Sequence, residues 1–364
     1  MILRIHRWVG VGLTIWLVMA TLSGTLLLWK DEYYGWRYPD LPKQPYVPSV
    51  SAAVIDRIVS STDAEIDTVR MPTASFPAYT IYFADGSEAI FHPDTATQIA
   101  EWGFLETIPA FLFELHAHLL FGEAGKKFVG VFGCLLFVTL NLGLVLWSRR
   151  RGVYGVRYFF PKNGSRPILV RAHAAQGISL SVLFLFLAFT GVTMAFSAPV
   201  YAGLNAIFGS VGALRPTVRQ LDSSATQINW QAISSSIADV FPDGAPREFN
   251  LPKSDSDPMV VRLRNAGELH PNGRSYLVLN PDSGKVLERI DATETGMGPA
   301  IGNMLYPIHS GKTGWWGHRV ALSALALSLI FIASSGSYLV LSRMRANAVL
   351  RRSRQRQSQV PLRN

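Results

Sequence analysis

Four of the eight histidines occupy positions that repeat within the chain. His6 precedes one glycine by four residues and a second by 18, and His173 does the same. His116 and His309 each precede a glycine by 27 residues. A lone histidine is usually an ordinary hydrogen-bonding residue, but imidazole also binds haem iron and small metal ions. Histidines at repeated positions therefore indicate a metal or haem centre.

The elements that must position these histidines are membrane-spanning helices. The chain is 49% hydrophobic with a mean hydropathy of +0.20, which is too apolar for an ordinary soluble domain. It contains four runs without Asp, Glu, Lys or Arg, each with about the 20 residues that a bilayer crossing needs. These runs are Val9 to Trp29, Phe128 to Trp147, Ala174 to Tyr201 and Val320 to Ser342. We expect all four to span the membrane, the first as a retained helix and not a cleaved signal peptide.

The distribution of charge predicts the orientation of these helices. Sixteen of the 34 basic residues lie at residues 1–8, 148–173 and after Ser342, and these segments contain no acidic residue. By the positive-inside rule they are cytoplasmic. The rest of the chain holds 18 basic and 25 acidic residues, so the two long loops face outward with a negative charge. The net charge of +9 therefore reflects the basic residues on the cytoplasmic side of the membrane, and it implies no nucleic-acid partner.

The two halves of the chain follow one plan. Each half begins and ends inside, so the repeats are parallel and are related by a pseudo-two-fold axis along the membrane normal. Equivalent residues then face each other across this axis. We expect His6 to approach His173 on the cytoplasmic side, and His116 to approach His309 at the outer interface.

The outward loops share a pattern too. Each has a mixed helical stretch, then strand-like segments around a Pro-Asp turn at Asp94 or Asp282. We therefore predict an α-helical membrane protein, with a four-helix transmembrane bundle built from two parallel repeats and two periplasmic α+β domains. The predicted segments are helix 1 at 1–30, domain 1 at 31–111, an outer-interface segment with helix 2 at 112–148, a basic loop at 149–172, helix 3 at 173–201, domain 2 at 202–305, an outer-interface segment with helix 4 at 306–342, and a basic tail at 343–364.

Haem fits the histidine pairs better than a bare metal ion does. A closed zinc site wants about four ligands, whereas each pair offers two, with no cysteine or carboxylate in a matching position. Gly10, Gly24, Gly177 and Gly191 lie on the same helices, and glycine lets a flat macrocycle approach the backbone.

The haem propionates would need cationic partners near the membrane surface. Arg7 and Arg171 flank the inner pair, while Lys126 and Arg319 each follow an outer histidine by ten residues. We expect these four residues to bind propionates. The alternative is ordinary snorkelling of long basic side chains at the interface.

His118 and His318 compete with His116 and His309 for the outer site. On a helix His118 lies about 200° around from His116, so both cannot face one haem. The repeat selects His116 and His309, because neither competitor has an equivalent in the other half. The two remaining histidines, His92 and His270, are interpreted as surface residues of the outward domains, with a contact to substrate as the alternative.

At these residues the chain resembles the PepSY-associated transmembrane family and, within it, the ferric-siderophore reductases of the FoxB type. The resemblance covers nearly the whole chain. One departure is His318, where the family commonly has a different residue before its arginine. The matching motifs are His6-Arg7-Trp8-Val9-Gly10, Leu115-His116-Ala117-His118-Leu119-Leu120-Phe121-Gly122-Glu123-Ala124-Gly125, His173-Ala174-Ala175-Gln176-Gly177 and Ile308-His309-Ser310-Gly311.

The resemblance implies PepSY-like outward domains, two haem b groups per chain on His6, His173, His116 and His309, and a bacterial inner-membrane location with both termini cytoplasmic. It also implies reduction of a ferric siderophore, such as a ferrioxamine, in the periplasm with release of ferrous iron. Nothing in the sequence supplies the electrons, so a donor is needed, either a cytoplasmic reductase or a quinol. The alternatives are a non-enzymatic, membrane-anchored PepSY binding module and a metal-ion transporter.

Overall fold

The structure, a computed structural model, describes residues 1–42, 51–150, 155–217, 219–222 and 227–358. The described chain forms two compact units. The first includes the described residues of 1–25, 113–195 and 320–358 and is helical, and the second, of the described residues of 26–112 and 196–319, contains all the described strands. Residues 151–154 and 359–364 of the predicted basic segments lie outside the described ranges.

Within the described ranges, three helices are long and apolar enough to cross a membrane, and one bent pair passes the same test. Side chains from all four parts share a hydrophobic core, which includes Leu17, Leu136, Phe184 and Leu329. Helices α1 and α11 also meet at a hydrogen bond of 2.5 Å between the Thr14 and Ser337 hydroxyls. The helices are α1 (Ile2–Leu27), α5 (Gly122–Arg150) and α11 (Trp316–Ser358), with the bent pair α6 (Arg166–Ser179) and α7 (Ser181–Ala195).

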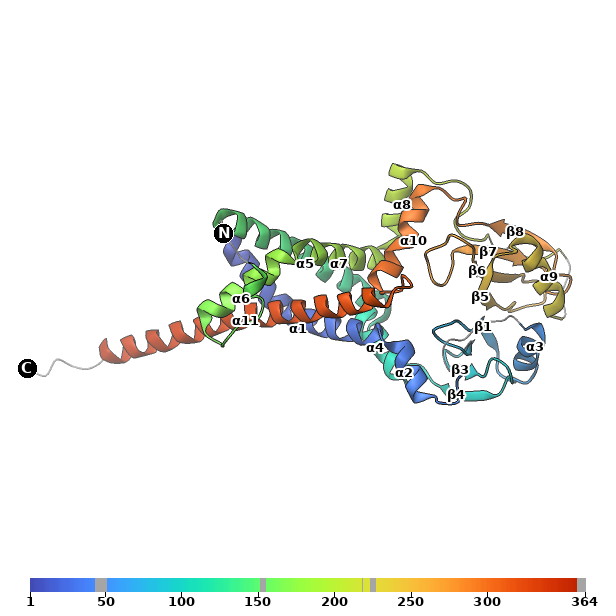
Figure 1. Cartoon of the computed structure of the whole chain (residues 1–364), viewed down its shortest axis with the longest axis horizontal. Coiled ribbons are helices and arrows are strands. Elements are labelled where there is room, and N and C mark those ends of the chain that lie inside the picture. The colour runs from blue at the N-terminus through green and yellow to red at the C-terminus, as the bar shows by residue number, and fades with distance from the viewer. Residues whose placement is uncertain (43–50, 151–154, 218, 223–226, 359–364) are drawn as a thin grey trace, which may run out of the picture. The chain divides into compact units, whose positions relative to one another are not determined.

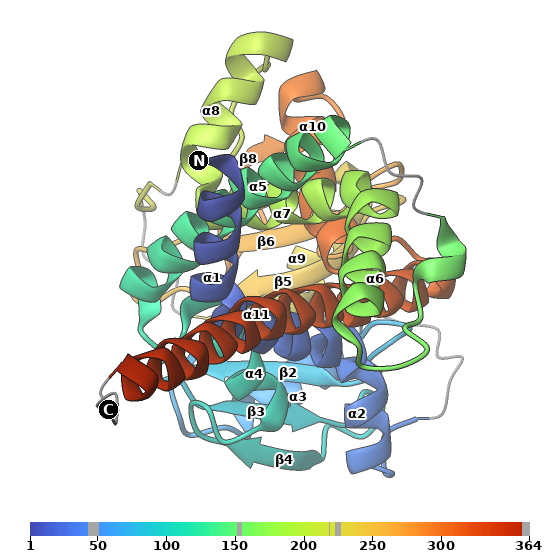
Figure 2. The same cartoon turned by 90° about the vertical axis from the view of Figure 1, so that its left-hand side faces the viewer.

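The third predicted span, 173–201, is not a continuous helix. It bends by 65° between α6 and α7, and it ends at Ala195. Leu180 at the bend has φ −103° and ψ 4°, and the hydroxyl of Ser181 donates to the Ile178 carbonyl at 2.8 Å. A serine that takes over a backbone carbonyl competes with the helical hydrogen bonds and favours a kink. As a result α6 lies across α11 (Figure 2) and not in line with α7.

The second unit is built on one antiparallel sheet of eight strands, in the order β4-β3-β2-β1-β5-β6-β7-β8. The first half of this order mirrors the second half about the β1–β5 pair. Figures 1 and 2 show the two sets of strands. The strands are β1 (Ile66–Arg70), β2 (Tyr79–Phe83), β3 (Glu88–Phe91), β4 (Gln98–Trp102), β5 (Ala245–Asn250), β6 (Met259–Arg264), β7 (Ser275–Leu279) and β8 (Val286–Ile290).

Helices α3 (Ala52–Ser60) and α9 (Trp230–Val240) cover one face of this sheet (Figure 1). The burial of β6 alternates along the strand, as expected for a sheet with one covered face. Ile58 of α3 and Ile233 of α9 join Val69 and Val261 of the strands in a single core. The two predicted outward domains, 31–111 and 202–305, therefore share one sheet and one core.

Pairing of β1 with β5 explains this difference from the sequence-based expectation. Each strand alone would be an exposed edge, and exposed edges readily pair with another strand. Here Val69 lies opposite Phe249, and Arg70 lies opposite Glu248 with an ion pair of 2.9 Å. Cross-strand ion pairs and packed apolar pairs both stabilise such a ladder.

The turns predicted at Asp94 and Asp282 are present in both halves. His92 Nδ1 accepts the backbone N–H of Asp94 at 3.2 Å, and Asn280 Oδ1 accepts that of Asp282 at 3.0 Å. The imidazole of His92 thus accepts the same backbone hydrogen bond that an Asn side chain accepts in an Asx turn. His92 is half-buried and has this local structural role.

Four further helices complete the described chain: α2 (Lys30–Arg37), α4 (Ile108–His118), α8 (Ser197–Phe208) and α10 (Met297–His309). Helices α8 and α10 pack together in the second unit, where Gly302 lies against the Tyr201 ring. A short 3₁₀ turn covers Val156–Tyr158.

Candidate functional site

His6 of α1 and His173 of α6 meet in the helical unit. Their ring centroids are 6.4 Å apart, and the ring planes are inclined by 81°. Both side chains are half-buried. The structure thus brings together the first pair that the repeat predicts.

Both rings are fixed by backbone carbonyls of other helices. His6 Nδ1 lies 3.0 Å from the Thr139 carbonyl oxygen, and His173 Nδ1 lies 3.0 Å from that of Ile332. A carbonyl can only accept, so the ring proton must be on Nδ1 in both cases. The lone pair of each Nε2 is then the one that can bind a metal, and such a second bond also fixes the ring orientation.

A glycine four residues after the accepting carbonyl makes room for each ring. Gly143 follows Thr139, and a β-carbon built on it would lie 3.3 Å from His6 Cε1. Gly336 follows Ile332, and a β-carbon there would lie 2.9 Å from His173 Cε1. These are the glycines 27 residues after His116 and His309, so equivalent histidines contact equivalent glycines. The sequence marked both glycines as repeated but did not show which histidine each would contact.

His116 of α4 has the same arrangement. Its Nδ1 lies 2.8 Å from the Ala20 carbonyl oxygen of α1, and a β-carbon built on Gly24 would lie 2.7 Å from its Cε1. Gly24 therefore accommodates an imidazole, and the expectation that it also lines a slot for a flat macrocycle stays a prediction. At Gly10 and Gly177 an added β-carbon would meet no described atom within 4 Å.

A tight turn between α4 and α5 follows the helix that carries His116. Leu119 and Leu120 have φ of 51° and 63°, a region that branched side chains rarely adopt. Gly125 lets the turn close, because a β-carbon built on it would lie 1.6 Å from the His118 carbonyl oxygen. Only glycine fits there.

The competing histidines have local partners. His118 Nδ1 contacts the Glu114 carboxylate at 2.8 Å, one helical turn away, and His318 Nδ1 lies 3.0 Å from the Thr313 hydroxyl. Neither Nδ1 contact is made with the backbone of another helix. The bond to a carbonyl four residues before a glycine distinguishes His116 from its neighbour His118.

His309 ends α10 and is half-buried. It belongs to the second unit, whereas His116 belongs to the first. The pairing of His116 with His309 stays a prediction.

The four basic residues expected at the propionates have diverse surroundings. Arg7 follows His6 in α1, and the exposed Arg171 lies with its guanidinium 6.0 Å from the Tyr158 ring centroid. Lys126 pairs with Glu123 at 3.3 Å, and Arg319 pairs with Glu32 at 2.5 Å. Binding of a propionate by Lys126 or Arg319 would therefore compete with a carboxylate of the chain itself.

The interpretation of His270 as a surface residue is wrong. Its side chain is 3% exposed, and its ring stacks on Tyr306 of α10 with centroids 5.0 Å apart. The loop between β6 and β7 folds back against α10 and covers the ring, which the polar sequence of this loop did not indicate.

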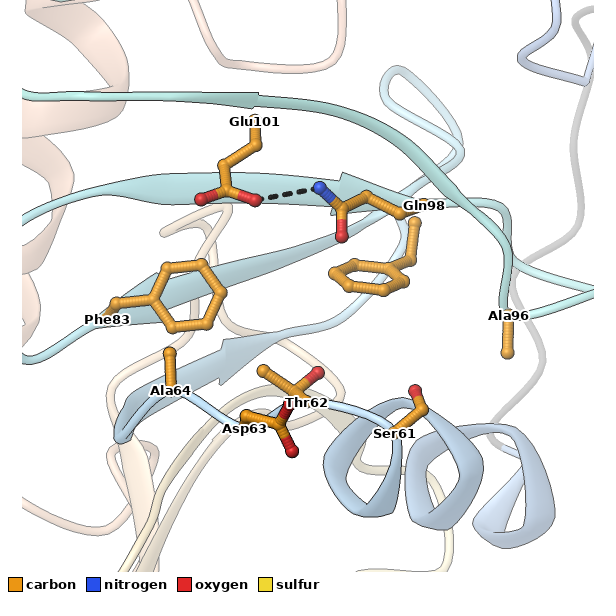
Figure 3. A pocket seen from close by; sticks show the side chains of 9 residues that line it. Ser61, Thr62, Asp63, Ala64, Phe83, Ala96, Gln98 and Glu101 are labelled. Atoms are coloured by element: carbon orange, nitrogen blue, oxygen red, sulfur yellow. Dashed lines mark hydrogen bonds between the residues drawn. The ribbon is translucent and has the colours of Figure 1, made fainter.

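A shallow pocket of about 310 Å³ lies beside the end of α3 (Figure 3). The lining includes two acidic residues, Asp63 and Glu101, and two aromatic residues, Phe83 and Phe91. Glu101 accepts a hydrogen bond from Gln98 at 2.8 Å. None of the predicted histidines contributes to this pocket.

The distance between the ring centroids of His6 and His173 is close to the distance expected for two imidazoles bound to one haem iron. Two metal–nitrogen bonds of about 2 Å, plus roughly 1 Å from each ring nitrogen to its centroid, place the centroids about 6 Å apart. The observed 6.4 Å fits this arrangement. Within the described ranges, no three His, Cys, Asp or Glu side chains form a group suited to a bare metal ion.

The chain matches one family of known proteins, although no curated protein matches it. A sequence model of the family described as the PepSY-associated TM region matches residues 3–228, which include α1, α5, both parts of the bent span and three of the four repeated histidines. The match covers more than half of the chain, so this membrane protein belongs to the PepSY-associated TM family.

Proposed function

We propose that the chain is a haem-dependent oxidoreductase of the bacterial inner membrane, which passes electrons through two haem b groups to a ferric siderophore in the periplasm. The observation that carries this proposal is the His6–His173 pair, at a distance suited to one iron between two imidazoles.

The residues of the inner site have separate tasks. His6 and His173 would hold the haem iron through their Nε2 atoms, and a bound haem would supply exchange of single electrons. The carbonyls of Thr139 and Ile332 hold the Nδ1 protons and so keep each Nε2 unprotonated. Gly143 and Gly336 let the rings reach these carbonyls. The rings are thus oriented before any cofactor binds.

The outer site would be built from His116 and His309. The shared carbonyl–glycine arrangement of His6, His173 and His116 supports His116 over His118 as a ligand. A ferric siderophore held outside would accept one electron, and the resulting ferrous ion is bound less tightly by oxygen-rich siderophores and is released. A cytoplasmic reductase or a quinol must supply that electron, and Arg7, Arg171, Lys126 and Arg319 remain the proposed propionate partners.

Reoxidation of the reduced protein tests this function. The purified protein is reduced with stoichiometric dithionite under anaerobic conditions, and ferric siderophore is added while the reduced haem absorption is followed. We expect the reduced band to decay and ferrous iron to appear with a chromogenic ferrous chelator. The gallium form of the same siderophore, which cannot be reduced, should leave the band unchanged. A reduced band that persists with the ferric form would overturn the proposed reaction, and a protein without haem absorption would favour a binding module.

A further inference from the structure

The loop between β6 and β7 carries a buried polar group that the proposed haem sites do not use. Gly273 has φ +67° in this loop, and its carbonyl accepts the Arg262 guanidinium at 3.1 Å. The Arg264 guanidinium donates to the Glu268 carbonyl at 3.1 Å. These bonds tie the loop over the strand that precedes it, with His270 buried at its centre.

The His270 ring presents a donor without an acceptor. Its Nδ1 accepts the backbone N–H of Asn272 at 3.2 Å, so the ring proton lies on Nε2. Among the described residues Nε2 is buried and has no hydrogen-bond partner. The Nε of Arg274 is likewise a buried donor without an acceptor. Buried polar groups are nearly always paired, so these two donors call for an acceptor that the described residues do not provide.

The surroundings of these donors are cationic. Burial is the main reason that the pKa of His270 is lowered to about 2, so the ring stays neutral. The pKa is lowered further by four nearby positive charges, those of Arg274, Arg262, Lys312 and Arg264. We call these four residues and His270 the cationic cluster.

The nearby acids are already engaged. Glu268 accepts from the backbone of Asn265 at 2.8 Å, from the backbone of Arg274 at 2.5 Å and from the Ser275 hydroxyl at 2.6 Å. Glu248 is shared between Arg70 and Arg262. The cluster therefore keeps an excess of positive charge in a loop region that is negative as a whole.

We propose that the cationic cluster binds the carboxylate groups of an anionic ferric chelate. The preferred substrate would then be a ferric polycarboxylate complex and not a neutral or cationic ferric hydroxamate. This inference rests on the proposed function and names its substrate class. Carboxylate oxygens are acceptors, and they form their strongest hydrogen bonds with Arg and Lys. Tyr306, which stacks on His270, precedes the proposed ligand His309 by three residues on α10, about 4.5 Å along the helix. His270 thus contacts α10 less than one helical turn from the proposed haem ligand His309.

Binding of gallium citrate to the purified full-length protein tests the site, because gallium keeps the charge of ferric iron and cannot be reduced. We expect titration calorimetry to detect binding of gallium citrate and none of a gallium trihydroxamate without free carboxylates. Arg274→Gln and Lys312→Gln should each weaken binding about tenfold or more. Arg274→Lys should retain part of the affinity because it keeps the charge. Lys285→Gln removes an exposed lysine of the same unit and should change the affinity less than twofold.

Two outcomes contradict the inference. Wild-type affinity in Arg274→Gln and Lys312→Gln, with unchanged melting temperatures, would show that the cluster does not bind the chelate. Loss of haem from these variants would instead assign the cluster to haem carboxylates. Binding of gallium citrate involves no electron transfer, so it tests the binding site separately from the proposed reductase function. If the protein binds gallium citrate but reduces no ferric chelate, the site is supported and the reductase function is contradicted. If the protein reduces a ferric trihydroxamate but does not bind gallium citrate, the function is supported and the site is contradicted.

Discussion

Gly336 of α11 makes room for the ring of His173 on α6, since a β-carbon at Gly336 would lie 2.9 Å from Cε1 of that ring. The equivalent contact of Gly143 with His6 is looser, at 3.3 Å. The two glycines thus offer a graded test of the inner site.

Gly336→Ala should displace the His173 ring and lower the occupancy of one haem by more than half. Gly143→Ala should have a smaller effect, because its neighbour needs to move by only a few tenths of an ångström. Gly12→Ala on α1, where an added β-carbon meets nothing within 4 Å, is the matched control and should keep full occupancy. The haem-to-protein ratio of each purified variant measures this order. Equal losses in all three variants would mean that the glycines act on general folding.

The second prediction concerns the choice between neighbouring histidines at the outer site. His116→Ala should remove one haem and abolish reduction of the external chelate, whereas His118→Ala should keep at least partial activity. Gly24→Ala should resemble His116→Ala, because its β-carbon would lie 2.7 Å from the His116 ring. Absorption spectra and the reoxidation assay report both effects. If His118→Ala or His318→Ala removes the outer haem while His116→Ala and His309→Ala spare it, the repeat-based assignment is wrong.

The third prediction is a dependence of stability on pH that arises from Lys30 of α2. Burial lowers its pKa from 10.5 to about 8, with a further decrease from Lys312 and Arg70 and an opposing effect from Asp31 and Glu88. Between these two values the unfolded chain binds the proton and the folded chain does not. The contribution of Lys30 to stability therefore increases as the pH rises through this window.

Lys30→Gln removes this charge without shortening the side chain greatly. At pH 7 the variant should melt roughly 3 °C above the wild-type protein, because it avoids burying a cation. The difference should shrink to about a quarter by pH 10, where the wild-type lysine is neutral in the folded state, and should disappear only well above pH 10.5, where the lysine is neutral in the unfolded chain too. Melting curves in detergent at pH 7, 8.5 and 10 measure it. A difference in melting temperature that is the same at all three pH values would contradict the lowered pKa of Lys30.

The fourth prediction is the topology, with both termini cytoplasmic and residues 31 to about 120 and about 203 to 315 periplasmic. It depends on the arginine-rich segments, of which the tail after Ser342 carries seven. A phosphatase reporter fused after Asn364 should be inactive, and one inserted after Ser60 should be active. Activity of the first fusion in the periplasm would reverse the orientation.

Composition was sufficient to predict most of the helical unit. The uncharged runs at 128–147 and 320–342 lie within the continuous helices α5 and α11, and the run at 9–29 extends two residues beyond the end of α1 at Leu27. The run at 174–201 does not form one helix, because the kink at Leu180 depends on a hydroxyl–carbonyl bond of Ser181 that apolar length does not reveal.

The sheet could be predicted only within each half. Local patterns indicate hairpins and their turns, but the β1–β5 pair joins Val69 to Phe249 across 180 residues. Nothing local to either strand specifies that pairing. The same limit applies to His270, since its burial depends on contact with the distant Tyr306.

The repeat predicted the inner histidine pair, and the structure brings these residues together. It did not reveal why Gly143 and Gly336 recur, because the contact of a ring with a helix backbone depends on how the helices pack. The four-residue spacing between an accepting carbonyl and a glycine has no visible meaning until the partner helix is known.

The most direct test of the central claim is the haem content of the purified protein, measured as pyridine haemochrome per chain. We expect two haem b groups in the wild-type protein and one in each of His6→Ala and His173→Ala, with the remaining haem spectrum unchanged. A wild-type protein with no Soret band would contradict the proposed haem sites, as would loss of both haems together from either variant while the chain remains folded.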